Sequence, residues 1–358
     1  MSRFGIQLKQ RHDMKHIVKI AFLMLGAVMI LTSCDRNRHT PDPGAQGVPI
    51  SFSALSQEAP VKAGESTLNV DFGVWGIARY KDNTKPPYIP WLVNEDGLMA
   101  QVSKEGVPVT GGYWFSGYTY NFIAIAPYPS GDDAFSDLVA TPAANITAHD
   151  SFSFTIDMGK KYAPTAENVA ADFDFDLMGA AARSAEVEIA SKQEAQNLSF
   201  NHLLTKLCVK VRFNGADGIV TGMRLYNVDT KAQYKLSLNN NAFAESHTIL
   251  TDEMNVELAG NDFEQVTEGT GDAAKDWQVA TIHLLPQNIS DFELYLDFQI
   301  GNAVTSNFKV NIDAATANPN YGVNEWYNWN LTISAKGIAF DVELAAWGDG
   351  GADEFPID

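Results

Sequence analysis

The chain has 358 residues, with 25 Lys and Arg against 44 Asp and Glu, which gives a net charge of −19 at pH 7. Phosphate binding needs a basic surface, so this charge argues against nucleic acid as a partner and against anionic lipid held through the protein surface. Hydrophobic residues make up 45% of the chain, which is enough to fill cores, and the length suggests two domains of roughly 100–200 residues each.

The N-terminus carries the parts of a secretory signal. Arg11, Lys15 and Lys19 precede an unbroken apolar run, 20–31, of 12 residues. A helix that crosses the hydrocarbon needs about 20, so a permanent membrane span is disfavoured and an exported chain is favoured. Met14 could be the true start as well as Met1, because the signal is complete from there.

The apolar run ends in Leu-Thr-Ser-Cys, which resembles a bacterial lipobox. The motif predicts a lipoprotein signal peptide over 1–33 and acylation of Cys34, which would become the new N-terminus. An ordinary signal with an incidental cysteine is the alternative. Residues 1–33 hold five of the basic residues and one acid, so the mature chain would carry a net charge of −23.

A flexible tether is expected over 34–47, because this stretch is rich in Pro, Gly and polar residues and has nothing to bury. Only Cys208 remains besides Cys34, so no disulfide within the chain is expected. The alternation around Cys208 predicts a buried, inert thiol.

From residue 48 the dominant pattern is the alternation of apolar and polar residues that is typical of β-strands. The clearest predicted strands are 48–54, 72–80, 118–127, 151–157, 206–213, 220–228, 234–239, 279–285, 292–300, 306–313, 329–334 and 338–344. Many short strands with almost no helical period indicate β-sandwiches. A stretch at about 180–197 has few large apolar residues, so we place an N-terminal domain over 48–190 and a C-terminal domain over 196–358.

Motifs for catalysis are missing from the sequence. The histidines do not have zinc-ligand spacing, and there is no G-x-S-x-G, P-loop or dinucleotide-binding motif. A carboxylate pair for glycoside hydrolysis stays open, because an acidic chain offers many candidates. We predict that the chain is not an enzyme and needs no cofactor.

The segment Asp-Phe-Asp-Phe-Asp raises the question of a metal site. Alternation would place Asp172, Asp174 and Asp176 on one face of a strand, about 6–7 Å apart, where carboxylates can hold calcium. A strand with a solvated acidic face is the favoured alternative, so these three residues are weak calcium candidates and no metal is predicted.

Two tryptophans are candidates for stacking on sugar rings. Most aromatic residues of an all-β chain fill its cores. Trp91 and Trp114 stand among Pro and Gly, so they are the residues most expected to be exposed. They support an alternative function, a glycan-binding lipoprotein at the cell surface.

Several segments together resemble the fimbrillin family, which comprises the type V pilins and related lipoprotein adhesins of Gram-negative anaerobes. The segments are the lipobox followed by "VPISFSA", then "YTYNFIAIAPYP", "DFDLMGA", "LSFNHLLTKLCVKV" and "EWYNWNLTI", with a late Trp347. Each is weak alone, but their order and spacing span nearly the whole mature chain.

The resemblance implies a structural and adhesive role with no catalysis. Family members have two tandem transthyretin-like, Greek-key β-sandwich domains and reach the outer membrane as lipoproteins. A trypsin-like protease then cuts after the first strand, and the strand leaves together with the lipid. A C-terminal strand of another subunit, of the same or a different kind, fills the resulting groove.

Carried onto this chain, the resemblance makes "VPISFSA" the first strand and Lys62 the candidate processing site, because Lys62 is the only basic residue in the loop that follows. Many relatives have Arg there, so an uncut accessory or anchor subunit stays open beside a stalk or tip subunit. The donor strand would map near the C-terminus, around Ile338–Leu344, with the tail that follows as the alternative. The expected partners are other fimbrial subunits, the outer membrane through lipid on Cys34, and a host or bacterial surface ligand.

Overall fold

The structure, a computed structural model, describes residues 48–56, 66–81, 99–107, 112–143, 149–163, 170–188, 194–215, 217–239, 242–269, 275–313, 319–334 and 337–346. Strands dominate these residues, which confirms the all-β prediction. The helical elements among them are a four-residue helix, α2 (Gly159–Tyr162), and a short 3-10 turn at Gly260–Asp262. No helix in these ranges is long and apolar enough to cross a membrane.

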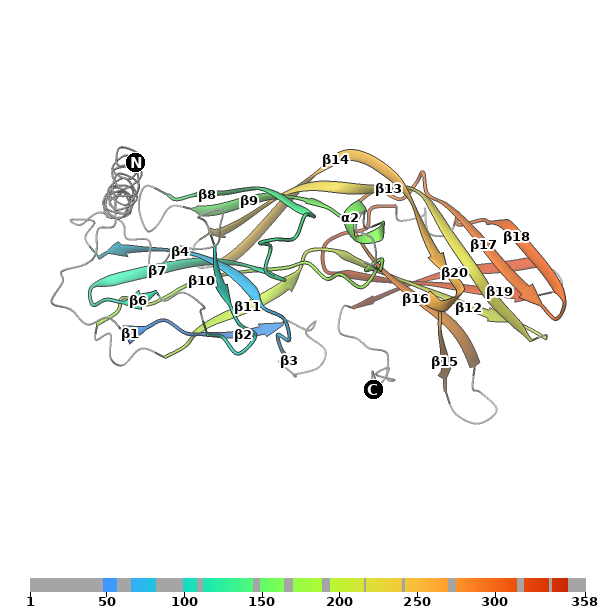
Figure 1. The fold of residues 1–358 in the computed structure, drawn as a ribbon, viewed down its shortest axis with the longest axis horizontal. Helices are drawn as coiled ribbons and strands as arrows, with labels where there is room; N and C mark the ends of the chain where they lie inside the picture. Colours follow the sequence, from blue (N-terminus) through green and yellow to red (C-terminus); the bar gives the residue numbers. More distant parts are fainter. Residues whose placement is uncertain are drawn as a thin grey trace, which may run out of the picture. The chain divides into compact units, whose positions relative to one another are not determined.

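The strands of the first half form a sandwich around one core. They are β1 (Val48–Pro49), β2 (Phe52–Ser56), β3 (Ser66–Thr67), β4 (Phe72–Tyr80), β5 (Ala100–Val102), β6 (Tyr113–Trp114), β7 (Tyr118–Ala126), β10 (Met178–Arg183) and β11 (Gln196–His202). Seven of them form the N-terminal sheet, in the order β3-β2-β11-β10-β7-β4-β5, and β1 pairs with β6. Phe52 of β2 packs on Phe72 of β4, so the sheet folds back on itself (Figure 1).

The strands β4 and β7 are buried on both faces. Phe122 and Ala124 of β7 face the core enclosed by the folded sheet, which we call the N-terminal core. Ile123 and Ile125 face the opposite side and join a second, larger core, which we call the main core. This double burial explains why β7 reads as an almost continuous apolar run.

A second sheet, called the shared sheet, connects the two halves. Its order is β18-β17-β13-β9-β8, and β14 also pairs with β13. The strands are β8 (Phe135–Thr141), β9 (Asp150–Asp157), β13 (Gly218–Asn239), β14 (Ala242–Ala259), β17 (Glu293–Ile300) and β18 (Ala303–Val310). The 22-residue β13 pairs with β17 along 218–226 and with β9 along 231–238. Figure 1 shows β13 and β14 running between the two halves.

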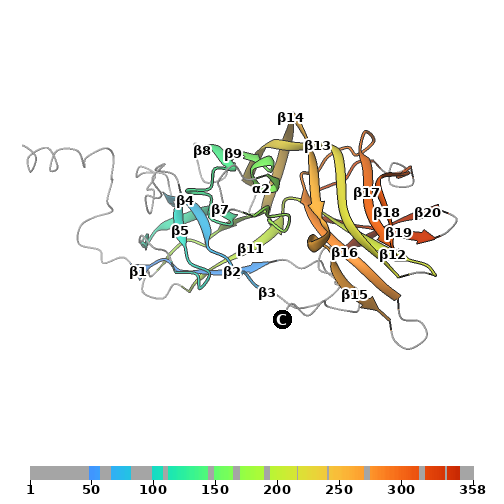
Figure 2. The same cartoon turned by 45° about the vertical axis from the view of Figure 1, so that its right-hand side comes forward.

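The C-terminal sheet has the order β15-β16-β12-β19-β20. Its strands are β15 (Glu264–Glu268), β16 (Lys275–Leu284), β12 (Thr205–Phe213), β19 (Glu325–Ser334) and β20 (Gly337–Ala346). Val209 on β12 and Trp329 on β19 are fully buried in the main core, together with Leu294 of the shared sheet. The C-terminal sheet therefore packs on the part of the shared sheet that contains β17 (Figure 2).

The boundary placed at 190–196 is crossed by strand pairing. β11, at 196–202, completes the N-terminal sheet, while β8 and β9 from the first half belong to the shared sheet. The main core also contains residues from both halves. The division of the chain into two tandem domains stays a prediction.

Candidate functional site

The first strand, which we define as 48–56, completes the N-terminal core. Ile50, Phe52 and Ala54 are buried at alternate positions, with exposed fractions of 1%, 4% and 9%. The Phe52 ring meets the Phe122 ring edge-on at 5.3 Å and the Phe72 ring at 6.3 Å between centroids. Aromatic pairs in this geometry add to the free energy gained by burial alone, so Phe52 is the main side-chain anchor of the strand.

Backbone hydrogen bonds hold the first strand mostly to β11. β2 pairs with β11 in parallel over five positions, from Gln196 opposite Phe52 to Phe200 opposite Ser56. On the other side, β3 supplies only two register positions, and β1 meets β6 at two. The layer that covers this side of the N-terminal core thus consists mainly of the first strand and β11.

Gly106 brings a turn against the first strand. Its carbonyl accepts a hydrogen bond from the Phe52 N–H at 2.9 Å, and its φ is +79°. A Cβ atom at this glycine would lie 1.8 Å from the Phe52 carbonyl oxygen. Only glycine allows both this backbone conformation and this approach, so the turn is shaped to receive the strand.

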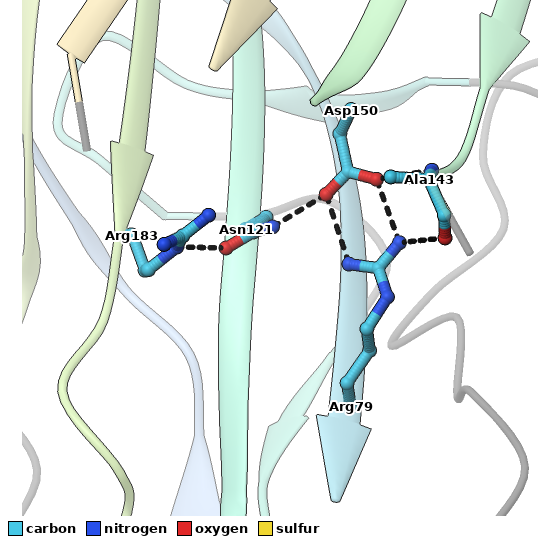
Figure 3. A network of polar contacts seen from close by, with 5 residues as sticks. All are labelled: Arg79, Asn121, Ala143, Asp150 and Arg183. Carbon is cyan, nitrogen blue, oxygen red and sulfur yellow. Dashed lines mark hydrogen bonds and ion pairs between the residues drawn. The ribbon is translucent and has the colours of Figure 1, made fainter. Parts of the chain in front are cut away.

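A buried polar network ties the N-terminal sheet to the shared sheet (Figure 3). Arg79 of β4 donates to both carboxylate oxygens of Asp150 on β9, at 2.9 and 2.6 Å, and both side chains are almost fully buried. Asn121 of β7 donates to the same carboxylate, and Arg183 of β10 donates to Asn121 at 2.8 Å. The Ala143 backbone both donates to Asp150 and accepts from Arg79.

The predicted donor strand lies at an edge of the C-terminal sheet. β20 pairs antiparallel with β19 from Gly337 to Ala346, and no other described strand pairs with β20. Ile338, Phe340 and Val342 are half-buried against the main core. Alternate apolar residues in the pattern Ile-x-Phe-x-Val therefore line one face of β20, as Ile-x-Phe-x-Ala lines the first strand.

Three of the predicted site residues, Cys34, Lys62 and Trp91, lie outside the described residues. The structure does describe Trp114, and the expectation that it is exposed for ligand stacking is wrong. Trp114 is 2% exposed and packs edge-on against Tyr120, with 4.7 Å between ring centroids. In the two-residue strand β6 the alternation turns Trp114 inward and leaves Tyr113 outside.

The acidic segment is not a strand. Residues 173–174 form a turn. Asp172 and Asp174 are exposed, and the Asp176 carboxylate lies 2.7 Å from Nδ1 of His202. Phe173 stacks on Tyr162, and its carbonyl accepts a hydrogen bond from the N–H of His283 in β16, but residues 172–176 are not part of any described strand ladder. In the described part of the chain, no three His, Cys, Asp or Glu side chains are placed to hold a metal ion.

The polar network was missed by sequence reasoning. Its four side chains come from β4, β7, β9 and β10; Arg79 and Arg183 stand in otherwise apolar strands, whereas Asp150 begins β9, in which Ser and Thr alternate with apolar residues. A charged residue such as Arg79 inside the run "FGVWGIARY" is the only available signal, because its partner Asp150 lies 71 positions further along the chain.

The chain was compared with known families and structures. A family model described as fimbrillin-like matches residues 67–347, and none of the curated proteins matches. A fimbrial protein from Bacteroides vulgatus is similar, with 15% identity, a TM-score of 0.46, and coverage of 83% of this chain and 99% of that one. A proposed cell adhesion protein from Bacteroides uniformis has 16% identity and a TM-score of 0.44, with 84% and 99% coverage.

A proposed polysaccharide-binding protein from Bacteroides thetaiotaomicron is more distant, with 12% identity, a TM-score of 0.35, and coverage of 84% of this chain and 96% of that one. At these identities and TM-scores no ligand or partner is carried over. The family match alone covers most of the chain, so the chain belongs to the fimbrillin-like family. This membership places it among the adhesion proteins of the cell surface.

Proposed function

We propose that this chain is a fimbrial structural subunit or accessory adhesin without enzymatic activity. It is made as a lipoprotein and held in the outer membrane by lipid on Cys34. Cleavage after Lys62 releases the first strand with its lipid, and a strand from another subunit replaces it. The alternative of a glycan-binding lipoprotein that uses Trp91 and Trp114 loses support, because Trp114 is buried.

The observation that carries the proposal is the way the first strand is built into the N-terminal core. Its removal would uncover the aromatic side chains around Phe122 and leave one edge of β11 without hydrogen bonds. An open core and an unpaired strand edge are both satisfied by the addition of an extended strand from another chain. The segment with Lys62 directly follows β2 in the sequence, so a cut there separates little else from the fold.

The pattern of β20 supports its assignment as the donor. A donor must place apolar side chains at the positions vacated by Ile50, Phe52 and Ala54. β20 offers Ile338 and Phe340 at the same spacing. Because β20 is paired with β19 within its own subunit, it must leave that edge before it can enter a neighbour.

The first experiment treats purified protein with a trypsin-like protease and determines the new N-termini. We expect a fragment that begins at Ala63, followed by oligomer ladders on gels. Lys62→Gln should abolish this fragment, whereas the control Lys104→Gln, at an exposed lysine elsewhere, should leave it unchanged. Oligomers that form without the cut would contradict the proposed order of events.

The second experiment adds a synthetic peptide of residues 337–346 to the cleaved protein. We expect saturable binding and a rise in the melting temperature, since a ligand that binds only the folded state stabilises it. A peptide with Phe340→Asp is the matched control, because a charge would have to enter the N-terminal core. Equal binding of both peptides would reject β20 as the donor.

The third experiment sequences the N-terminus of protein taken from cell surfaces. A blocked Cys34 identifies a lipid-anchored form, and Ala63 identifies a processed subunit. An unblocked N-terminus at Cys34 or nearby would overturn the assignment of the lipid anchor.

A further inference from the structure

The outer face of the C-terminal sheet carries polar side chains from every strand. In β12 the buried Val211 points into the main core, so Lys210 and Arg212 on either side of it point outward. Strand register continues this face, because Lys210 lies opposite Asn330 on β19, and Asn330 lies opposite Asp341 on β20. This face is separate from the first strand and from its groove.

A shallow groove of about 310 Å³ crosses this face. Its lining extends from Glu268 on β15 and Lys275 on β16 to Asp341 and Glu343 on β20. Neighbouring strands lie about 4.8 Å apart, so the groove reaches across roughly 19 Å. Its volume is at the lower end for small-molecule sites, which are about 300–1,000 Å³.

The floor of the groove is held in place by its own contacts. The Arg212 Nε donates to Thr332 Oγ1 at 2.8 Å, and its guanidinium lies over the Trp277 ring, 4.9 Å from the centroid. Beside it, Lys210 Nζ forms an ion pair with Glu268 at 2.6 Å. A long side chain fixed in this way loses little further freedom when a ligand binds to it.

Other polar groups of the groove have unused hydrogen-bonding capacity. Within the described part of the chain, no protein group is bonded to the side-chain amide of Asn330 or to the carboxylates of Asp341 and Glu343. Arg212 has five N–H donors and spends one on Thr332. The groove therefore offers donors on β16 and β12 and acceptors on β20, with the Asn330 side chain, which can do both, between them.

The charge of the lining decides which ligands fit. Three cations, Lys210, Arg212 and Lys275, face three carboxylates, so the groove is balanced on a chain of net charge −19. A polyanion would meet the carboxylates of β20, and an apolar peptide would find a polar floor. A sugar hydroxyl both donates and accepts a hydrogen bond, so it can use both kinds of group.

We propose that this groove binds a neutral, hydroxyl-rich saccharide chain that lies across β15, β16, β12, β19 and β20. Arg212 and Lys275 donate to its oxygens, while Asn330, Asp341 and Glu343 accept from its hydroxyls. The groove exists only while β20 stays paired with β19, so the site belongs to the subunit before strand exchange or to an accessory subunit that keeps its own β20. It rests on the proposed function only for its biological use.

Affinity gel electrophoresis tests the site with the full, uncut chain carrying Lys62→Gln. The probes are dextran, yeast mannan, galactan, arabinoxylan and xyloglucan, with heparin and polygalacturonate as anionic comparisons. We expect retardation by at least one neutral polymer, with an affinity that does not fall with added salt, because no counterions are released.

Two groove variants, Asn330→Ala and Glu343→Ala, should each weaken this binding roughly threefold to tenfold, as expected for one lost hydrogen bond. The matched controls are Asn255→Ala and Glu253→Ala, which change the same residue types at exposed positions of β14. Circular dichroism and melting temperatures of all four variants check that the fold is kept.

Three outcomes would overturn the site: no retardation by any neutral polymer, a preference for heparin or polygalacturonate, or binding that the groove variants leave unchanged. Assembly is measured separately with the cleavable chain. If the chain forms normal oligomer ladders but does not bind glycan, the groove alone is rejected. If it binds glycan but forms no oligomer ladders, the pilus assembly alone is rejected.

Discussion

Arg79 and Asp150 form the buried ion pair at the centre of the polar network in the first half of the molecule. The guanidinium and the carboxylate are removed from water, and each has the other as its charged partner. Asn121 and the Ala143 backbone satisfy further lone pairs and protons of the pair. A buried pair of this kind specifies how β4 and β9 meet. Removal of either partner is strongly destabilising, because the other charge stays buried without compensation.

We expect Asp150→Ala to lower the free energy of unfolding by about 3–5 kcal/mol, because the Arg79 charge would stay buried without its partner. Urea denaturation measures this change. The control is Asp133→Ala, which removes the exposed partner of Lys160 and should cost at most about 1 kcal/mol. Equal losses in the two variants would refute the special role of the buried pair.

His283 predicts a dependence of stability on pH. Burial lowers its pKa to about 4, with a smaller opposing effect of Asp176, whereas the unfolded chain takes up the proton near pH 6.5. The unfolded state therefore binds more protons between about pH 6.5 and 4, so stability is full above this window and falls as the pH decreases through it. The loss amounts to about 3 kcal/mol.

The variant His283→Gln isolates this effect, because it keeps a polar side chain that does not titrate. Urea denaturation from pH 7.5 to 4 should give a shallower loss of stability for this variant than for the wild type. Parallel curves for the two proteins would show that His283 does not contribute to the acid sensitivity.

Among the structural elements, the first strand has one long pairing, with β11, and short pairings elsewhere. Its pairing partners β3 and β6 are two-residue strands, and its inward side chains all enter the N-terminal core. An apolar inner face and a single long paired edge are what we expect of a strand that is exchanged. The inward side chains hold the strand in the N-terminal core, and its exchange requires the opening of only one long pairing, the one with β11.

Phe52→Ala in the uncut chain should reduce stability by about 3–5 kcal/mol, the usual cost of truncating a buried aromatic side chain. Ser51→Ala, at the exposed neighbouring position, is the control and should be nearly neutral. Thermal unfolding of both variants provides the measurement. A small effect at Phe52 would mean that the strand is held by its backbone alone.

The strands that sequence reasoning missed are mostly edge or short strands. β14 is 18 residues long, but many of its residues are exposed on both faces, so it lacks the alternation that marks a half-buried strand. For the acidic segment the error is the reverse, because a strand is predicted where the structure has none. Its Asp-Phe alternation predicts a strand, but Phe173 and Phe175 pack around Tyr162 and Lys161 through a turn.

At the scale of the whole molecule, the main core lies apart from the first strand. No residue of 48–56 belongs to the main core, whereas the N-terminal core contains Ile50, Phe52 and Ala54. We therefore expect that the fold can lose the strand and keep the main core, which is the largest of its core clusters. A subunit that has lost its first strand would need this separation to stay folded until a donor strand binds.

Hydrogen exchange on the cleaved chain, after removal of the first strand, tests this separation. We expect faster exchange in β11, which loses its parallel neighbour, and unchanged protection in β12 and β19, which lie in the C-terminal sheet. The uncut protein is the reference. Loss of protection throughout both halves would mean that the first strand supports the entire fold.

The amino-acid sequence by itself determined that the chain is built from strands, because alternation is a local property. β4 was predicted at its observed bounds, and β7 and β12 within one residue. The family resemblance also followed from the order of local segments, and the match over 67–347 confirms it. The assignments of Cys34 and Lys62 likewise came from short motifs and stay predictions.

Only the tertiary structure decided which faces are covered and which residues meet. It buried Trp114, joined two predicted strands into the single β13, and brought Arg79 to Asp150. It also assembled a balanced groove from five strands that come from three separate stretches of the chain. The physical reason is that burial and charge pairing depend on contacts between distant segments. A local pattern shows only that a strand has an inner and an outer face, and it does not show what covers either face.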